Sequence, residues 1–220
     1  HLLLLTTWSF FFFGGASLPA GWLGDRWSRH GMMLIFFIGI GAASVMTGFA
    51  ETPTQIEIGL ALLGVFGAIY HPIVVEEAGR VGRALAINGV WGNMGVALAA
   101  LTTGAIAELY GWRWAFIIPG IASIFVGLLY GLHLAKAKVA AEAKVKKAAP
   151  AISISLQRRA FIFLIIAPLF GGLIFQATTI SLPKIMDERL AGLFPGTAEI
   201  GLITALVFAC AAVAQLIVGE

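Results

Sequence analysis

Residues 21–30 read GWLGDRWSRH and separate two long apolar runs. Asp25 stands at the end of the first run, and Arg26 and Arg29 follow it within about one helical turn. A charged side chain near the core of a bilayer is costly to bury, so such residues are usually paired or functional. The stretch therefore predicts a tight turn between two helices, whose charges have a defined task at the membrane surface.

The composition is that of a polytopic membrane protein. Of the 220 residues, 60% are hydrophobic and 11% are charged, and the mean hydropathy is +0.95. A soluble domain is about half apolar and about one quarter charged. The single cysteine, Cys210, lies in an apolar run, so neither a disulfide framework nor a cysteine-based metal site can form within the chain. No nucleotide-binding loop, cluster of metal ligands or nucleophile–base set occurs, so we expect no enzyme activity, no cofactor, no bound metal and no nucleic-acid partner.

Seven apolar segments reach the length of about 20 residues that a membrane-spanning helix needs. They cover residues 2–23, 31–50, 56–75, 84–109, 115–134, 160–185 and 198–218. Between two of them, residues 110–114 (YGWRW) predict a turn whose aromatic side chains suit a membrane interface. The fold class is thus predicted as all-α, with seven helices that cross the bilayer.

Lys and Arg are divided unequally between the two sides that these alternating segments define. Of the 14 such residues, 11 lie on one side, in residues 24–30, 78–83 and the basic linker 136–159. The other three are Arg113, Lys184 and Arg189. Because cytoplasmic loops carry the excess of Lys and Arg, the first side is predicted to be cytoplasmic. We expect an integral protein of the plasma membrane, which is the inner membrane in a bacterium.

The charged turn resembles the signature between the second and third helices of major facilitator superfamily transporters, roughly G-x-x-x-D-R-x-G-R-[RK]. The matching residues are Gly21, Asp25, Arg26 and Arg29. Ser28 stands where the family prefers Gly, and His30 stands where it prefers Arg or Lys. In the family this turn latches the two halves at the cytoplasmic face, and the resemblance implies the same role here, with Gly24 as a further small residue of the latch. The alternative is an ordinary positively charged cytoplasmic loop.

The resemblance implies the family's twelve-helix fold of two six-helix halves, of which this chain would contain helices two to eight. Residues 1–135 would be helices two to six of the first half, 136–159 a cytoplasmic linker, and 160–220 helices seven and eight of the second half. Helix one and helices nine to twelve would belong to the same polypeptide outside this chain. A weak internal repeat agrees with this division, since an apolar run ends in Gly-acid both at Gly24-Asp25 and at Gly219-Glu220.

Tyr70-His71-Pro72 is the second candidate site. An imidazole binds and releases protons near pH ~6.5, and Pro72 interrupts the backbone hydrogen bonds of its helix. An ionisable group within a membrane helix is by default a functional hypothesis. We therefore group Tyr70 and His71 with Asn88 and Gln176, polar residues of other segments, as a candidate proton or substrate site. The alternative is a histidine that packs against a neighbouring helix. The Tyr-His-Pro element resembles one found in exporters related to fosmidomycin resistance.

Small residues recur in the segment 84–109. Gly89, Gly92 and Gly95 are spaced by three, and such a stripe lets two helices pack backbone to backbone. We assign these three glycines to helix packing rather than to ligand binding. Further along the segment, Ala99-Ala100 stands where many proton-driven exporters carry a Gly-Pro pair. This departure counts against drug/proton antiport.

The sequence as a whole favours secondary active transport of a small solute by alternating access, with proton coupling through His71 as a further option. A transport-inactive membrane sensor on the same fold is the main alternative, because fold does not fix function. A polytopic membrane enzyme is the third class, and it would require a cluster of His, Asp or Cys at one interface, which the sequence lacks. The expected partners are therefore the lipid bilayer, a small-molecule solute and protons.

Overall fold

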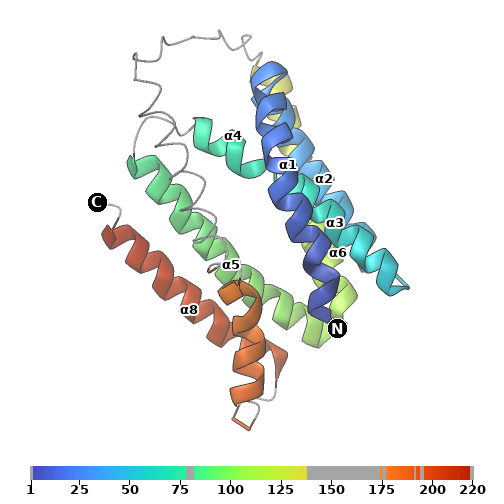
Figure 1. The fold of residues 1–220 in the computed structure, drawn as a ribbon, viewed down its shortest axis with the longest axis vertical. Helices are drawn as coiled ribbons and strands as arrows, with labels where there is room; N and C mark the ends of the chain where they lie inside the picture. The colour runs from blue at the N-terminus through green and yellow to red at the C-terminus, as the bar shows by residue number, and fades with distance from the viewer. Residues whose placement is uncertain are drawn as a thin grey trace, which may run out of the picture. The chain divides into compact units, whose positions relative to one another are not determined.

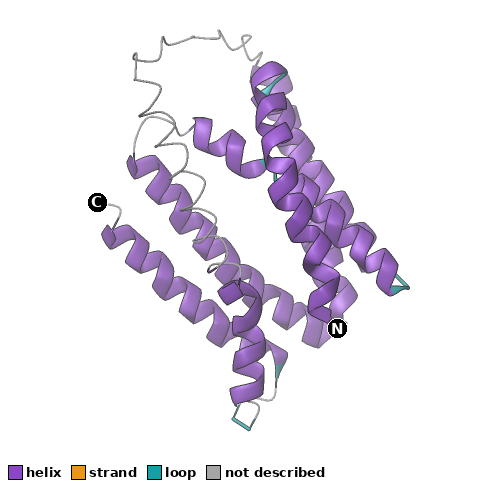
Figure 2. Ribbon diagram, in the orientation of Figure 1, coloured by secondary structure: helices purple, strands orange, loops and turns teal. Residues whose placement is uncertain are grey.

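The computed structural model describes residues 2–77, 82–137, 174, 177–190, 192–193 and 196–218. Within these ranges every regular element is a helix, as Figures 1 and 2 show. The elements in chain order are η1 (Leu2–Thr6), α1 (Thr7–Arg26), α2 (Arg29–Gly48), α3 (Pro53–Gly67), α4 (Tyr70–Glu77), α5 (Gly82–Tyr110), α6 (Trp112–Ala137) and α8 (Thr197–Val218). Residues 177–190 are helical as well. The all-α prediction is confirmed.

Four of the described helical stretches are long and apolar enough to cross a membrane: Arg29–Gly48, Pro53–Ile73, Gly89–Tyr110 and Trp112–Lys136. They coincide with the second to fifth predicted segments. The first predicted segment forms η1 and α1, and α1 is not among the four because its glycines, serines and tryptophans lower its mean hydropathy. The apolar stretch described in α8 is shorter, and most of the predicted segment 160–185 lies outside the described residues.

Polar side chains before the first turn explain where two of the helices begin. Ser28 precedes α2, and its Oγ accepts a hydrogen bond from the Gly31 backbone N–H at 3.0 Å. Thr52 precedes α3 and forms a reciprocal capping box with Gln55, while Pro53 occupies the first helical position. The first amides of a helix have no partner within it, so such side chains stabilise each start by about 1 kcal/mol.

A single residue connects α5 to α6. Gly111 has a φ of 90°, a left-handed backbone conformation that residues with a Cβ atom rarely adopt. Its N–H donates to the Ala107 carbonyl at 3.0 Å, which closes the last turn of α5. The turn predicted at residues 110–114 is confirmed, although α6 begins inside that range, at Trp112.

The predicted helix 56–75 is broken into α3 and α4. Pro72 has no N–H group, and in a continuous helix its ring would collide with the carbonyl four residues earlier, that of Ala68. The break falls at Ala68 and Ile69, which are 0% and 5% exposed. Pro72 then lies in the first turn of α4, where no helical partner is lost for its missing donor. The structure therefore has the interruption that Pro72 predicts.

Glycine allows α2 and α6 to touch backbone to backbone. A Cβ atom at Gly41 would lie 2.6 Å from the Gly120 carbonyl oxygen, and one at Gly120 would lie 2.8 Å from the Gly41 carbonyl oxygen. Gly48 and Gly127 bring the same two helices together on either side of this point. Small residues permit such close packing within membranes, where the hydrophobic effect does not drive helices together.

Side-chain bonds also join α2 to α6, and they fix the direction of the pair. His30 Nδ1 lies 2.8 Å from Tyr130 Oη at one end. At the other end the Arg113 guanidinium donates to the Ala50 carbonyl at 2.9 Å. Between these ends, serine hydroxyls donate to carbonyl oxygens of the facing helix, Ser44 to Phe116 at 2.7 Å and Ser123 to Phe37 at 3.0 Å. The helices are therefore antiparallel, with the charged turn and residue 111 at opposite ends.

α3 packs against both α1 and α2. Gly64 lies against the Ser9 carbonyl of α1, and Gly59 lies against Thr47 of α2, which is completely buried. A small apolar core joins these helices to α4; its buried members are Ala20, Met32, Ile69 and Ile73. The charged turn and the helix break therefore share one core.

α5 and α8 run beside each other (Figure 1). A Cβ atom at Gly104 would lie 2.9 Å from the Thr197 carbonyl oxygen, and one at Gly201 would lie 2.7 Å from the Ala100 carbonyl oxygen. The buried face of α8 includes Thr204, which is 0% exposed. These two helices are thus a second closely packed pair.

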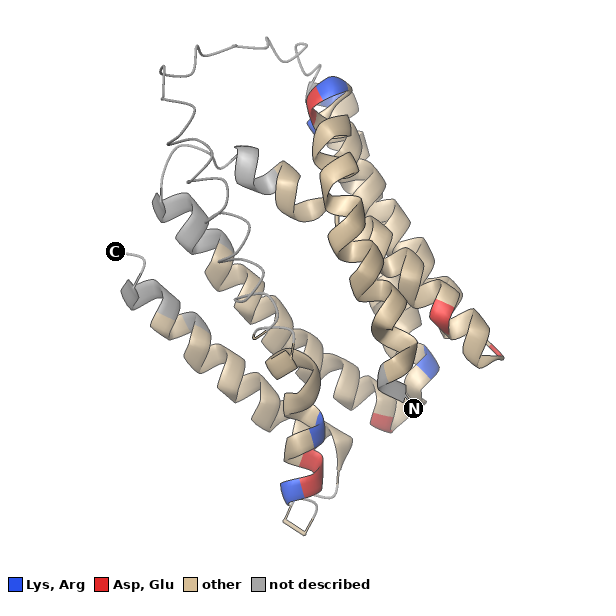
Figure 3. Cartoon of the chain, in the orientation of Figure 1, with Lys and Arg blue, Asp and Glu red and all other residues tan. Residues whose placement is uncertain are grey.

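The chain forms two compact units, residues 1–138 with 196–220, and residues 139–195. The helices η1 to α6 and α8 belong to the first. Among the described residues of this unit, Lys, Arg, Asp and Glu lie toward the helix ends (Figure 3). In the second unit, Lys184 and Glu188 form an exposed ion pair at 3.7 Å within the helix 177–190. The division into residues 1–135, 136–159 and 160–220 stays a prediction.

Candidate functional site

A partly exposed ion pair closes the charged turn. An Arg29 guanidinium nitrogen lies 3.6 Å from Asp25 Oδ1, and the side chains are 28% and 56% exposed. Exposed pairs of this kind contribute about 0.2–1 kcal/mol. The bridge therefore orients the end of α1 against the start of α2, but it does not commit Asp25 to this partner.

Aromatic rings brace the same turn. The Arg26 guanidinium lies 5.1 Å from the centroid of the Trp22 ring, which is within the range of a cation–π contact. The Trp27 ring covers Gly31, where a Cβ atom would lie 3.0 Å from it. The two basic residues predicted for the latch thus have different neighbours, since Arg29 pairs with Asp25 and Arg26 lies over an aromatic ring.

The two departures from the family signature each have a structural explanation. Ser28, in place of Gly, supplies the N-cap of α2. His30, in place of a basic residue, lies within hydrogen-bond distance of Tyr130 on α6. The cap at Ser28 could have been found from its position before a helix. The contact between His30 and Tyr130, 100 residues apart, could not have been found from the sequence.

The glycines of the turn contact the helix break. A Cβ atom at Gly21 would lie 3.2 Å from Pro72 Cβ, and one at Gly24 would overlap Ile73 Cδ1. Gly24 and Ile73 are both buried. The end of α1 therefore rests on the residues that immediately follow His71. The sequence predicted the charged turn and His71 as two separate sites, whereas in the structure the helices that carry them pack against each other.

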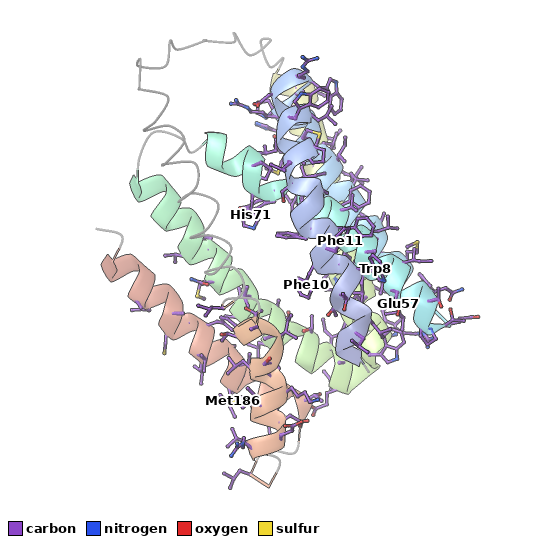
Figure 4. All side chains as sticks on the ribbon, in the orientation of Figure 1. Trp8, Phe10, Phe11, Glu57, His71 and Met186 are labelled. Atoms are coloured by element: carbon purple, nitrogen blue, oxygen red, sulfur yellow. The ribbon has the colours of Figure 1, made fainter. Side chains whose placement is uncertain are left out.

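His71, on α4, lies beside aromatic rings of neighbouring residues (Figure 4). Its ring centroid is 5.8 Å from that of Phe13 on α1 and 5.7 Å from that of its neighbour Tyr70, with nearly perpendicular planes. Phe36 of α2 extends the group, at 5.3 Å from Tyr70. The His71 side chain is exposed rather than enclosed by these rings. An imidazole in this setting offers both a proton-binding nitrogen and an aromatic face.

Comparison with known proteins identifies the family. The model of the Major Facilitator Superfamily matches residues 2–220. The chain belongs to the major facilitator superfamily. The resemblance seen in the charged turn is thereby confirmed, and the protein is an integral membrane protein of helical fold.

Several curated proteins of this superfamily are similar to the chain. The puromycin resistance protein pur8 of Streptomyces alboniger is 30% identical over 48% of this chain and 22% of its own length. The multidrug resistance protein MdtG of Proteus mirabilis is 26% identical over 94% of this chain and 52% of its own length. The membrane sensor protein UhpC of Salmonella typhimurium is 26% identical over 57% of this chain and 30% of its own length. The chain therefore spans about half, or less, of the length of these relatives.

The roles predicted for the other site residues stay predictions. Gln176 and the side chain of Asn88 lie outside the described residues, so the candidate proton or substrate site is described only at Tyr70 and His71. No described atom lies within 4 Å of a Cβ atom built at Gly92 or Gly95. The described close contacts of α5 are instead made further along, at Ala100 and Gly104 with α8. The packing stripe of Gly89, Gly92 and Gly95 is thus untested.

Proposed function

We propose that the chain is part of a secondary transporter that moves a small organic solute across a bacterial plasma membrane by alternating access. Membership of the superfamily supports this, as do relatives named for resistance and multidrug efflux. One observation carries the proposal. The end of α1 that bears the charged turn packs on the helix break that bears His71, through Gly21 on Pro72 and Gly24 on Ile73. A displacement at either place would be transmitted to the other.

In this proposal the charged turn is a conformational latch on the cytoplasmic side. Because the Asp25 side chain is exposed, its pair with Arg29 contributes little stability, and Asp25 can change partners at small cost as the two halves rock. The latch comprises Gly21, Gly24, Asp25, Arg26 and Arg29. The helix that it holds would belong to the rest of the polypeptide, which would also supply helix one and helices nine to twelve.

His71 is the group that we propose for proton coupling. A wet cavity favours the charged form of an imidazole, and burial against apolar helices disfavours it. Alternating access would move His71 between two such environments, so that proton binding and conformation become linked. The contacts of Gly21 and Gly24 on α1 with Pro72 and Ile73 on α4 join the charged turn directly to the helix that bears His71.

The relatives and the rings around His71 favour export of a planar organic compound. Puromycin resistance and multidrug resistance are the functions in the names of pur8 and MdtG. Phe13, Tyr70 and His71 present aromatic faces on which such a compound could stack. Ala99-Ala100, in place of a Gly-Pro pair, counts against proton antiport, so coupling has to be measured directly.

The decisive experiment is gradient-driven flux of puromycin in proteoliposomes of the full-length protein. We expect flux in the wild type, and we expect His71→Gln to abolish gradient-driven flux while puromycin exchange at equal pH persists. His133→Gln, a change of the same chemistry at an exposed position on α6, should behave as the wild type. Full gradient-driven flux in His71→Gln would exclude His71 as the coupling group.

A transport-inactive sensor is the second candidate function, because the similarity to UhpC covers 57% of this chain. A sensor binds its solute but does not move it. Protection of a cysteine at position 70 by the solute, without flux in either direction, would favour the sensor. Flux of any solute down its gradient would favour the transporter.

A further inference from the structure

The carboxylate of Glu108 reaches from α5 to the N-terminus of α8. Its Oε2 accepts a hydrogen bond from the Ala198 N–H at 2.8 Å and lies 3.3 Å from the Thr197 hydroxyl. The same hydroxyl lies 3.3 Å from the Gly104 carbonyl oxygen of α5. One acidic side chain thus ties the last turn of one helix to the first turn of another, about 90 residues later.

The N-terminus of α8 is a favourable place for the Glu108 carboxylate. The first N–H groups of a helix have no acceptor within it, and the helix dipole places partial positive charge there. A carboxylate is therefore a good acceptor at this position. Glu199 provides a natural comparison, because its Oε2 accepts from the Gly196 N–H at 3.1 Å and so caps α8 without crossing to α5.

The position of Glu108 places the contact at the end of the bundle opposite the charged turn. Glu108 lies three residues before Gly111, next to the start of α6. Arg113 at that start bonds to Ala50, whereas His30, beside the charged turn, bonds to the far end of α6. The helix pair α5–α8 is therefore joined on the face that the charge distribution predicts to be external.

We propose that Glu108 is a clasp that holds α5 to α8 while the external side of the protein is closed. The inference rests on the proposed function, in which α5 and α8 belong to the two halves that separate during alternating access. Behind the clasp the backbones are in contact at Gly104 and Gly201, and Thr204 is completely buried three residues after Gly201. Opening this side requires the Glu108 hydrogen bonds to break. The clasp therefore determines how often the buried face of α8 is exposed to water.

The test measures how fast a cysteine at position 204 reacts with a membrane-impermeant maleimide. Thr204→Cys is close in size to the native residue, and Cys210→Ser removes the native thiol, which is exposed. In this background we expect Glu108→Ala to raise the labelling rate about three- to tenfold, because the Glu108 hydrogen bonds are exposed and such bonds contribute modestly. Glu108→Gln keeps an acceptor oxygen and should raise the rate less.

Glu199→Ala is the matched control. It removes a carboxylate from the same helix start but no bond to α5, so the labelling rate should change less than about twofold. An unchanged rate in Glu108→Ala would overturn the clasp, and so would an equal rise in Glu199→Ala, because that would indicate fraying of α8 alone. If Glu108→Ala is not monodisperse in detergent, Glu108→Gln and Thr197→Val provide the same comparison with smaller expected rises.

The labelling experiment needs no solute, so it separates the clasp from the transport function. A Glu108-dependent rate in a protein that moves no solute would support the clasp and count against the transporter. Normal flux of solute together with a rate that does not depend on Glu108 would support the transporter and eliminate the clasp.

Discussion

The helix pairs α2–α6 and α5–α8 both pack closely at glycine residues, but they differ in the side-chain hydrogen bonds that join them. Both bring backbones together at glycine, at Gly41 and Gly120 in one pair and at Gly104 and Gly201 in the other. α2 and α6 are in addition linked by side chains at both ends and in the middle. Among the described side chains, the hydrogen bonds between α5 and α8 gather around Glu108. The comparison suggests that the first pair is a fixed support and that the second is able to part.

The largest expected effect comes from breaking the fixed pair. Gly41→Ala would place a methyl group 2.6 Å from the Gly120 carbonyl, a backbone atom that cannot move without its helix. We expect a loss of about 1–3 kcal/mol of stability, even though alanine favours the helix by up to about 1 kcal/mol. The thermal unfolding midpoint in detergent measures it.

Gly15→Ala is the control for this substitution. Gly15 lies within α1, and no described atom lies within 4 Å of a Cβ atom there. The change should be neutral or stabilise the protein by about 0.5–1 kcal/mol through helix propensity. Equal losses in Gly41→Ala and Gly15→Ala would mean that the α2–α6 contact is not what stabilises the fold.

A smaller effect, on rate rather than stability, is expected at the charged turn. Asp25→Asn removes an exposed charge, so the unfolding midpoint should stay within experimental error of the wild type. If the turn is a latch, the substitution shifts a conformational equilibrium, and a difference of ~1.4 kcal/mol changes it tenfold. Turnover of the full-length protein should therefore fall more than solute affinity does.

The control for the latch is Glu51→Gln, which removes an exposed carboxylate at the other end of α2. Its turnover should match that of the wild type. Unchanged turnover in Asp25→Asn at normal expression would remove the latch assignment and leave the turn as a positively charged loop.

The smallest expected effect tests the start of the fixed pair. Ser28→Ala removes the side-chain acceptor that caps α2, and such losses cost about 1 kcal/mol. Ser28→Asn keeps an acceptor and should retain most of the stability. Thermal unfolding measures both variants, and a Ser28→Ala loss above that of Gly41→Ala would contradict the order that the comparison predicts.

The elements of this fold were predictable because they are local. Apolar length, Pro72 and the glycine at position 111 determine where helices run, break and turn, and no information from distant residues is needed. Helix partners are a different matter. All the membrane helices present similar apolar surfaces, so the sequence does not show that α6 packs on α2, or that the end of α1 rests on Ile73.

The same limit applies to the candidate site. The charged turn and His71 were recognised because ionisable groups are rare in membrane helices. Nothing in the sequence singles out Glu108, because its hydrogen bonds to α8 depend on packing between distant segments. A carboxylate near a helix end and a threonine before another helix are each common, and only their proximity gives them a joint role.

The partnership of α2 and α6 has a consequence for biosynthesis. His30 and Tyr130 are separated by 100 residues, which take roughly 5–20 s to synthesise at about 5–20 residues per second. Until α6 is inserted, the glycine face of α2 and the Ser44 hydroxyl have no α6 to pack against or bond to. α2 therefore lacks its packing partner until α6 is made, and chains that stop before Trp112 should be substrates for membrane proteases.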